Sequence, residues 1–368
     1  MSSTGDSAGV PSGLYLRTRI SRLLNPFWPT FSRLESFFVG DELAGQEIDR
    51  PVYVTGIARA GTTIVTEMLA ASLELTSHQY ADFPFLFTPY WRNYLAQRSQ
   101  VAAPKAIERA HKDRILVSAN SPEAFEEVLW MLFDPALHYK YPIRALGPND
   151  APEGFPDFYR DHVKKLLAVR GASRYLAKGN YNLLRLRWLA DCMEDPRVII
   201  MVRQPSWHVA SLMKQHALFN EAQRIDQRTR WQLAASGHFE FGPQRVAPVY
   251  LDNDAQQVVV DLWSSGDEVR GWAKLWAQGY ALAREYLEDS ALQRQLLLVR
   301  YEDLCGEPEK TLSRIADHCQ LDGFDKIAER YVPQLRPPQY YEPGFTDAQL
   351  AAIDDETHET ATALGYRR

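Results

Sequence analysis

The sequence predicts an α/β fold in which a central parallel sheet is flanked by helices. Apolar runs rich in β-branched residues alternate with segments of helical periodicity. The run at 197–202 is continuously apolar after its first residue, as expected of a central parallel strand. No internal repeat or low-complexity tract interrupts this alternation. The other expected strands lie at 51–55, 174–177 and 295–299.

Length and composition exclude several classes of protein. The chain has 368 residues, enough for one large α/β domain or two smaller ones. A net charge of −6 argues against a general nucleic-acid binder, which would carry a basic excess. The three cysteines are far apart in the chain, so neither a disulfide framework nor a zinc site is predicted, and a reducing, cytoplasmic compartment fits best. We expect no transmembrane segment, because no run of about 20 apolar residues occurs.

Residues 1–45 are predicted to form an N-terminal extension. The first dozen residues are rich in Ser and Gly and are expected to be disordered, and an amphipathic helix is expected within 14–36. This helix interleaves arginines with leucines and aromatic residues, which suits either a membrane surface or a packed interface. We favour packing on the body of the protein or on a second subunit, so that a homo-oligomer and a peripheral membrane contact both stay open.

Residues 46–368 are predicted to form a single domain. Helical periodicity is expected at 64–75, 154–170, 183–193, from 205 to about 219, at 271–288 and at 308–319. Ser121 followed by Pro122 predicts a helix start, where Glu123, Glu126 and Glu127 would be caps or solvated acids. Weak periodicity at 220–255 predicts a helical insertion that covers a substrate or contacts another subunit.

The most informative feature is the loop from Gly56 to Thr63. A strand that enters a glycine-bounded loop and then a helix directs backbone N–H groups and the helix dipole at one point, which suits a bound phosphate. A nucleoside triphosphatase loop has a Lys after its second glycine, to reach the β- and γ-phosphates. Here Thr62 takes that position, and the only cation of the loop is Arg59. The ligand should therefore be a phosphate that needs no triphosphate–metal clamp.

This loop resembles the 5′-phosphosulfate loop of the sulfotransferases, in which a basic residue, a Ser or Thr and Gly-Thr-Thr follow the first strand. The matching residues are Arg59, Ala60, Gly61, Thr62 and Thr63. Ala60 departs from the family pattern, so that one hydroxyl contact is lost. The resemblance implies the sulfotransferase version of the P-loop NTPase-like fold.

A second segment resembles the 3′-phosphate motif of the same family. Arg203 follows the strand at 197–202, and Ser211 comes eight residues later in the expected helix, with Gln204 in place of the common acid. Together the two motifs imply a ligand with phosphates at both ends of a ribose. The resemblance identifies it as 3′-phosphoadenosine 5′-phosphosulfate, a co-substrate used without a metal.

The resemblance also suggests residues for the chemistry. Lys178 lies 25 residues before Arg203, as in tyrosylprotein-type members, and is expected to be a second cation near the transferred group. Family members of the carboxylate type place a general base at a spacing that Asp82, 23 residues beyond Arg59, matches. Asp82 is our first choice for the base, and His111 is the second.

These features predict a sulfotransferase that moves a sulfuryl group in line from the donor to a hydroxyl acceptor. The acceptor stays open among sugars, phenols, lipid alcohols and peptide tyrosines. One alternative is a P-loop kinase or hydrolase that has lost its Lys, although Arg203 stands where its magnesium-binding acid would be expected. The other alternative is a nucleotide-dependent binding protein without catalytic activity.

Overall fold

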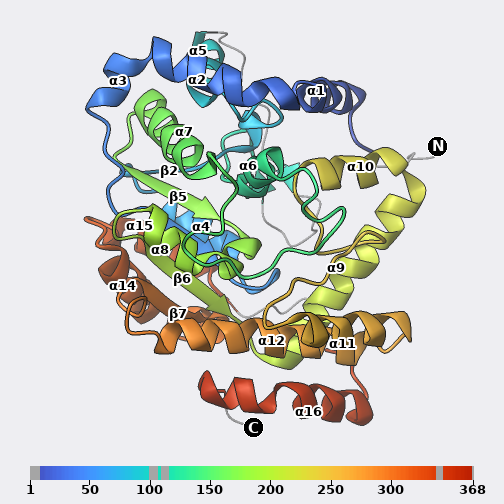
Figure 1. The fold of residues 1–368 in the computed structure, drawn as a ribbon. Coiled ribbons are helices and arrows are strands. Elements are labelled where there is room, and N and C mark those ends of the chain that lie inside the picture. The colour runs from blue at the N-terminus through green and yellow to red at the C-terminus, as the bar shows by residue number, and fades with distance from the viewer. Residues whose placement is uncertain (1–8, 99–106, 109–115, 337–342, 367–368) are drawn as a thin grey trace, which may run out of the picture.

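The computed structural model describes residues 9–98, 107–108, 116–336 and 343–366. Its centre is a five-stranded, all-parallel sheet with the order β2-β5-β1-β6-β7 (Figure 1). The α/β class with a central parallel sheet is thus confirmed. The strands are β1 (Val52–Thr55), β2 (Leu75–Thr76), β5 (Arg174–Lys178), β6 (Arg197–Val202) and β7 (Leu296–Arg300). A separate antiparallel pair joins β3 (Ile107–Glu108) to β4 (Leu116–Val117).

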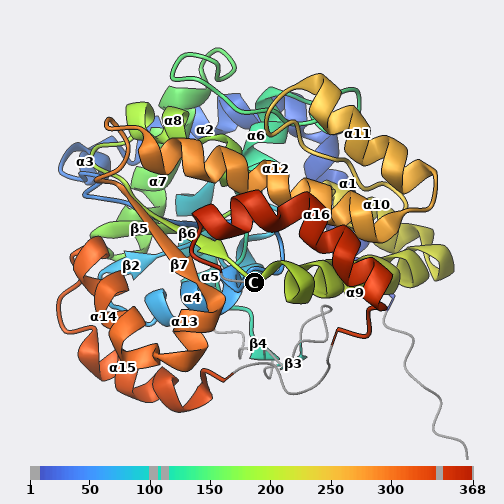
Figure 2. The ribbon, with the colours of Figure 1, turned by 90° about the horizontal axis from the view of Figure 1, so that it is seen from below.

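Helices cover both faces of the sheet (Figure 2). Successive strand residues point to opposite faces, so that Val52 and Val54 enter one apolar cluster and Tyr53 enters the other. The first cluster includes α4 (Thr62–Leu69), α13 (Tyr301–Gly306), α14 (Pro308–Cys319) and α15 (Asp325–Tyr331). The second includes α6 (Glu126–Phe133), α7 (Phe155–Arg170), α8 (Leu186–Cys192), α9 (Pro205–Ile225) and α12 (Glu268–Glu288). Burial of both faces explains the apolar strand sequences.

The N-terminal residues form an arm that crosses the top of the molecule in Figure 1. It consists of α1 (Ser12–Leu23), η1 (Asn25–Phe27), α2 (Trp28–Phe38) and α3 (Gly40–Ala44). The single helix expected within 14–36 is therefore two helices, separated by a short turn at Pro26. The arm packs on α5 (Pro89–Arg98), α7 and α10 (Gln227–Ala235). In the described part of the chain, the structure contains no helix with the length and apolar character needed to cross a membrane.

Several element boundaries differ from the sequence prediction. The helix expected at 64–75 ends at Leu69, because Leu75 pairs with Arg174 as part of β2. The helix start predicted at Ser121 is wrong: residues 121–123 pair with residues 78–80, and α6 begins only at Glu126. The segment at 220–255 contains the end of α9, all of α10 and the first turn of α11 (Asn253–Ser264). The C-terminal helix α16 (Asp347–Ala363), which the sequence reading missed, packs on α12.

Candidate active site

The predicted site residues lie at the carboxyl ends of three neighbouring strands. β1 lies between β5 and β6, and all three are parallel. Their carboxyl ends therefore bring together the loop after β1, Lys178 at the end of β5 and Arg203 just after β6. Ligands of open α/β sheets bind in crevices at the carboxyl ends of the strands. The chain order of these residues would not by itself place them together, since more than 100 residues separate the loop from Lys178.

The loop between β1 and α4 has the backbone geometry of an anion cradle. Gly56 and Gly61 have φ angles of 141° and 99°, and Arg59 adopts a φ of 74°. A Cβ atom on Gly56 would lie 2.4 Å from the carbonyl oxygen of Met201, so only glycine fits there. The chain then enters α4 at Thr62, which places the first N–H groups of that helix beside the loop.

The second motif contacts this loop directly. Nε of Arg59 lies 3.4 Å from Oγ of Ser211, which is carried by α9. One turn earlier in α9, Nε2 of His208 lies 2.8 Å from the carbonyl oxygen of Ala58. Burial lowers the pKa of His208 to about 3, and so it is neutral and holds the loop against α9 as a hydrogen-bond partner. The two segments that the sequence reading connected only by family resemblance are thus neighbours in space.

Tyr301 lies between the glycine of the loop and the arginine of the second motif. Its ring occupies the space beside Gly61, where an added Cβ would lie 2.6 Å from a ring carbon. The guanidinium of Arg203 sits over the same ring, 5.0 Å from its centroid, and is buried. The backbone of the next motif residue, Gln204, is held by Glu302, whose Oε1 accepts its N–H at 2.9 Å. Tyr301 and Glu302 therefore fix the relative position of the two motifs.

Lys178 pairs with Glu123, which the sequence predicts to be a cap or a solvated acid. Its Nζ atom lies 2.9 Å from Oε1 of Glu123 and 3.4 Å from Oγ1 of Thr63, the second threonine of the loop. Both charged side chains are buried, with 8% of each residue exposed. Glu123 does not cap a helix, because it precedes α6 and its N–H donates to the carbonyl oxygen of His78. A carboxylate, an ammonium group and a loop hydroxyl are therefore in contact.

The ionisation of Glu123 follows from its neighbours. Burial tends to raise the pKa of this carboxyl, but the ammonium of Lys178, together with His238, holds it well below its ordinary value. Glu123 is consequently a carboxylate at neutral pH, with Lys178 as its counter-ion. Any change that draws the ammonium away from it would raise the pKa of Glu123 and make it a stronger base.

Asp82 is engaged elsewhere. Both of its carboxylate oxygens accept hydrogen bonds from Nη2 of Arg170, at 2.6 and 2.7 Å, and Oδ2 also accepts the N–H of Gln79 at 2.8 Å. His78 and Arg170 hold the pKa of Asp82 far below its usual range, even though burial alone would raise it. These contacts fix the 3₁₀ turn η2 (Tyr80–Asp82) to α7. The geometry therefore favours Glu123 over Asp82 as the base.

The remaining candidates for the base are His111, Glu126 and Glu127. His111, our second choice for the base, lies outside the described residues. The sequence predicts that Glu126 and Glu127 are caps or solvated acids. That prediction is wrong, because both are buried. Glu127 pairs with Arg185 at 2.6 Å, while Glu126 accepts hydrogen bonds from buried tyrosines and from Asn182. Their contacts are those of structural acids.

The sequence reading missed a polar group that completes the site. His238 and Glu240 come from the irregular segment after α10, and Nδ1 of His238 lies 3.8 Å from Oε2 of Glu240. Nδ2 of Asn180, just after β5, donates to Oε1 of Glu240 at 2.9 Å. These three residues line a small cavity together with Lys178. No spacing rule marks His238 and Glu240 in the sequence, because they lie 60 and 62 residues beyond Lys178 in a segment without regular periodicity.

Comparison with known proteins then decides the family. Residues 51–326, three quarters of the chain, match the sulfotransferase family. The chain is a sulfotransferase. It is 24% identical over 344 residues to the omega-hydroxy-beta-dihydromenaquinone-9 sulfotransferases Stf3 of Mycobacterium bovis and Mycobacterium tuberculosis, covering 87% of this chain and 76% of each relative.

Solved structures agree with the fold. The crystal structure of sulfotransferase STF9 from Mycobacterium avium superposes with a TM-score of 0.52 at 13% identity, covering 90% of this chain and 82% of that one. This likeness shows a shared architecture. The matched family region begins in the residue before β1 and includes all the site residues described above.

Proposed function

We propose that this sulfotransferase uses 3′-phosphoadenosine 5′-phosphosulfate as its donor and transfers the sulfuryl group to a hydroxyl acceptor. The observation that carries the proposal is the contact between Arg59 and Ser211, 3.4 Å apart. It joins the loop suited to a 5′-phosphate to the segment suited to a 3′-phosphate, and one doubly phosphorylated nucleotide needs both. The donor supplies a sulfuryl group bound to a phosphate oxygen.

The residues present fit such a donor. Arg59, the N–H groups at the start of α4 and the hydroxyls of Thr62 and Thr63 form a donor set for one phosphate. Arg203 and Ser211 supply a guanidinium and a hydroxyl for the other. Because the transferred group carries less charge than a triphosphate, fixed cations can stabilise the charge that develops on the leaving oxygen.

Lys178 and Glu123 are proposed to act as a pair. Glu123 would accept the proton of the acceptor hydroxyl, and Lys178 would stabilise negative charge on the leaving oxygen. The two roles are coupled, since an ammonium group that turns toward the leaving oxygen no longer depresses the pKa of Glu123. The base thus gains strength when the leaving group is stabilised.

The polar group beside this pair supports a hydroxyl acceptor. His238, Glu240 and Asn180 offer donors and acceptors of hydrogen bonds next to Lys178. The mycobacterial relatives are named for an omega-hydroxy compound, which supports the same class of acceptor.

Calorimetry with the desulfonated nucleotide tests the donor. Adenosine 3′,5′-diphosphate should bind much more tightly than adenosine 5′-phosphate, and Arg203→Ala should remove that preference while leaving the weaker ligand unaffected. If the protein is instead a P-loop kinase that has lost its Lys, it should bind ATP in the presence of magnesium. Absence of binding at millimolar adenosine 3′,5′-diphosphate would overturn the proposal. Binding without transfer from labelled donor to any of a panel of alcohols and phenols would favour the binding-protein alternative.

A further inference from the structure

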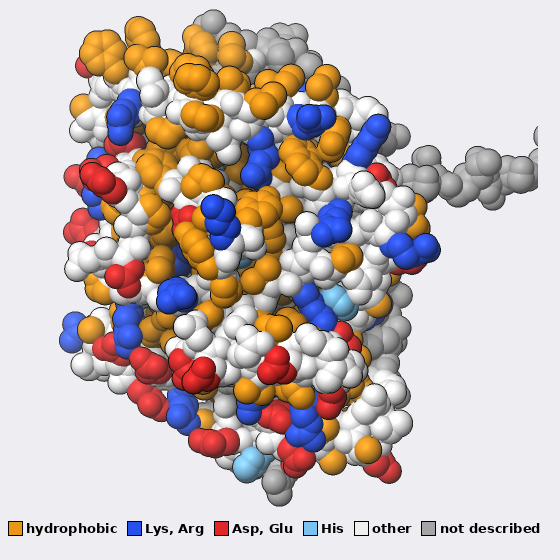
Figure 3. All heavy atoms as spheres, turned by 45° about the vertical axis from the view of Figure 1, so that its right-hand side comes forward, with side chains coloured by type: hydrophobic (Ala, Val, Ile, Leu, Met, Phe, Trp, Pro, Cys, Tyr) orange, Lys and Arg blue, Asp and Glu red, His pale blue; other side chains and the backbone are white. Residues whose placement is uncertain are grey.

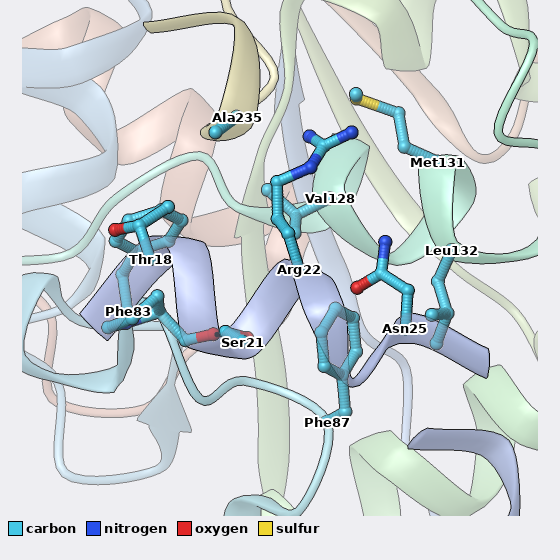
Figure 4. Close-up of a pocket in the computed structure, with 11 residues that line it drawn as sticks. Thr18, Ser21, Arg22, Asn25, Phe83, Phe87, Val128, Met131, Leu132 and Ala235 are labelled. Carbon is cyan, nitrogen blue, oxygen red and sulfur yellow. Dashed lines mark hydrogen bonds between the residues drawn. The ribbon is translucent and has the colours of Figure 1, made fainter. Parts of the chain in front are cut away.

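The inner face of the N-terminal arm buries small polar and charged side chains beside a large aromatic ring. The polar residues are Thr18 and Ser21 in α1 and Ser32 and Glu35 in α2, and the ring is that of Trp28. These residues fasten the arm to the body. Oγ of Ser21 donates to the carbonyl oxygen of Pro84 at 2.7 Å. The gap between α1, the segment at 83–87 and α6 is reduced to a cavity of about 20 Å³ (Figure 4).

A buried ion pair fixes the second half of the arm. Nζ of Lys165 in α7 lies 3.1 Å from Oε2 of Glu35 and donates to both oxygens of Ser32, at 2.7 and 3.0 Å. Both charged side chains are fully buried. Since breaking a buried pair is costly, α2 cannot easily roll to hide its other face. The arm therefore presents one fixed outer surface.

That outer surface is apolar. In α1 the exposed large residues are Leu16, Ile20 and Leu23, which share one helical face, and in α2 they are Leu34, Phe37 and Phe38. Leu23, Phe37 and Phe38 are 76%, 80% and 69% exposed. Phe27 of η1 and Leu95 of α5 are also exposed. The ring of Phe38 lies 6.2 Å from that of Trp91, one turn before Leu95 in α5. Figure 3 shows hydrophobic side chains gathered along the edge of the molecule where Figure 1 places the arm. A contiguous apolar surface of this kind marks a contact site.

The exposed charges of α1 and α2 are positive, and the first exposed acids, Asp41 and Glu42, follow in α3. Residues 12–38 contain four arginines and a single acidic residue, the buried Glu35, in a chain whose net charge is −6. On the helical wheel of α1, Arg17 and Arg19 flank the apolar stripe on its two sides. Arg33 is exposed in α2. An apolar stripe bordered by arginines is the pattern of a helix that lies in a membrane interface.

A basic groove lies between α1 and α10. It is lined by Arg22, Tyr139, Arg230 and Trp231, with Gln227, Ala234 and Gln244, and has a volume of about 460 Å³. None of these described lining residues is acidic. Two guanidinium groups and two aromatic rings in one groove suit a phosphate-bearing headgroup.

We propose that the first part of the arm, α1 to α2 (residues 12–38), binds the surface of a bilayer that contains anionic phospholipids. The apolar side chains enter the interface, and the arginines contact lipid phosphates. Two copies of residues 12–38 would bring together two surfaces that each carry four arginines and no exposed acid, and so the charges favour an anionic lipid surface over a second copy. The helices of the arm are 12 and 11 residues long and so lie along the surface. This inference does not depend on the proposed donor or acceptor.

Vesicle cosedimentation of the full chain tests this inference. The protein should bind vesicles of phosphatidylcholine and phosphatidylglycerol on the order of tenfold more than phosphatidylcholine alone, and added salt should weaken the binding. Leu23→Glu with Phe37→Glu should reduce binding at least about tenfold. The matched control is Leu73→Glu with Leu350→Glu, two exposed leucines outside the arm, which should bind like the wild type. Thermal unfolding checks that each variant is folded.

A second variant keeps the test independent of the apolar substitutions. Arg17→Gln with Arg19→Gln and Arg33→Gln changes only exposed side chains and should lose most of the preference for anionic vesicles. Failure of the wild type to bind anionic vesicles overturns the proposal. So does equal binding by the Leu23→Glu, Phe37→Glu protein. If the wild type does not bind vesicles but forms a dimer in sedimentation velocity, and the Leu23→Glu, Phe37→Glu protein is a monomer, a second copy covers the patch.

Discussion

Nζ of Lys178 lies 2.9 Å from Oε1 of Glu123 at the edge where β5 meets the phosphate loop. The pair is buried, and Thr63 of the loop lies 3.4 Å from the same ammonium group. A buried ion pair adds little net stability, because the loss of hydration offsets the attraction between the charges. Its position beside the loop instead supports the proposal that Glu123 acts as the base and Lys178 stabilises the leaving oxygen.

Replacing Glu123 by Gln should abolish most of the transfer activity. The amide keeps the size of the side chain but cannot take the proton of an acceptor, and general bases contribute about 10²- to 10⁴-fold. We expect kcat to fall within that range while the affinity for adenosine 3′,5′-diphosphate stays near the wild-type value. Labelled-donor turnover and calorimetry measure the two quantities. Unchanged kcat in the folded variant would exclude Glu123 as the base.

Replacing Lys178 by Met should change the pH profile as well as the rate. Without the ammonium group, the burial of Glu123 is no longer offset, so its pKa rises. The acid limb of kcat against pH, which reports the loss of the carboxylate, should move to higher pH, and kcat should fall about 10²-fold. A matched change of a distant lysine, Lys310→Met, should leave both unchanged. If the acid limb stays in place in Lys178→Met, the coupling between the pair is refuted.

Replacing Asp82 by Asn should affect folding more than catalysis. The substitution leaves the side chain of Arg170, which is only 10% exposed, without its counter-ion, which costs about 3 kcal/mol. Urea unfolding should show this loss, while kcat of the folded protein should remain within a few-fold of wild type. A large fall in kcat without a loss of stability would restore Asp82 as the base.

The sequence predicts those parts of the fold and of the site that have a local signal. Continuous apolar runs predict the strands at 197–202 and 295–299, and a 3.6-residue periodicity predicts the helix at 308–319. Both signals reflect burial directly. The loop and Arg203 could be found because each motif is contiguous. Helices α10 and α16 give no such signal, since their periodicity is weak and their contacts are long-range.

The proposal that Glu123 is the base required three-dimensional information. Asp82 fits a spacing from Arg59, but its partner Arg170 lies 88 residues further along the chain. Glu123 sits in a stretch that looks like a helix start, and only its pairing with Lys178, 55 residues away, reveals its place in the site. Spacing along the chain cannot distinguish these cases, because burial and pairing of a carboxylate depend on which strands are neighbours.

Replacing Gly61 by Ala should weaken binding of the nucleotide. The new Cβ would lie 2.6 Å from the ring of Tyr301, so the loop or the ring must shift, and the φ of 99° adds backbone strain. Calorimetry with adenosine 3′,5′-diphosphate should show a loss of about tenfold or more, equivalent to about 1.4 kcal/mol. Gly266→Ala is the control, since its φ is 86° but nothing lies within 4 Å of the added atom. It should cost stability without changing affinity, and equal affinity losses in both variants would argue against a specific role for the loop.

The stability of the fold should depend on acid pH through Glu127. Burial tends to raise the pKa of this carboxyl, but Arg185 and His138 lower it to about 2 in the folded protein. A folded pKa below the unfolded value means that the contribution is complete above about pH 4.5 and is lost as the pH falls toward 2. Urea unfolding should therefore show wild type about 3 kcal/mol more stable than Glu127→Gln at pH 7, with the gap narrowing below pH 4.5. Exposed Glu309→Gln should stay close to wild type throughout. A gap that is constant from pH 7 to pH 3 would mean that lost packing, and not the charge paired with Arg185, accounts for the difference.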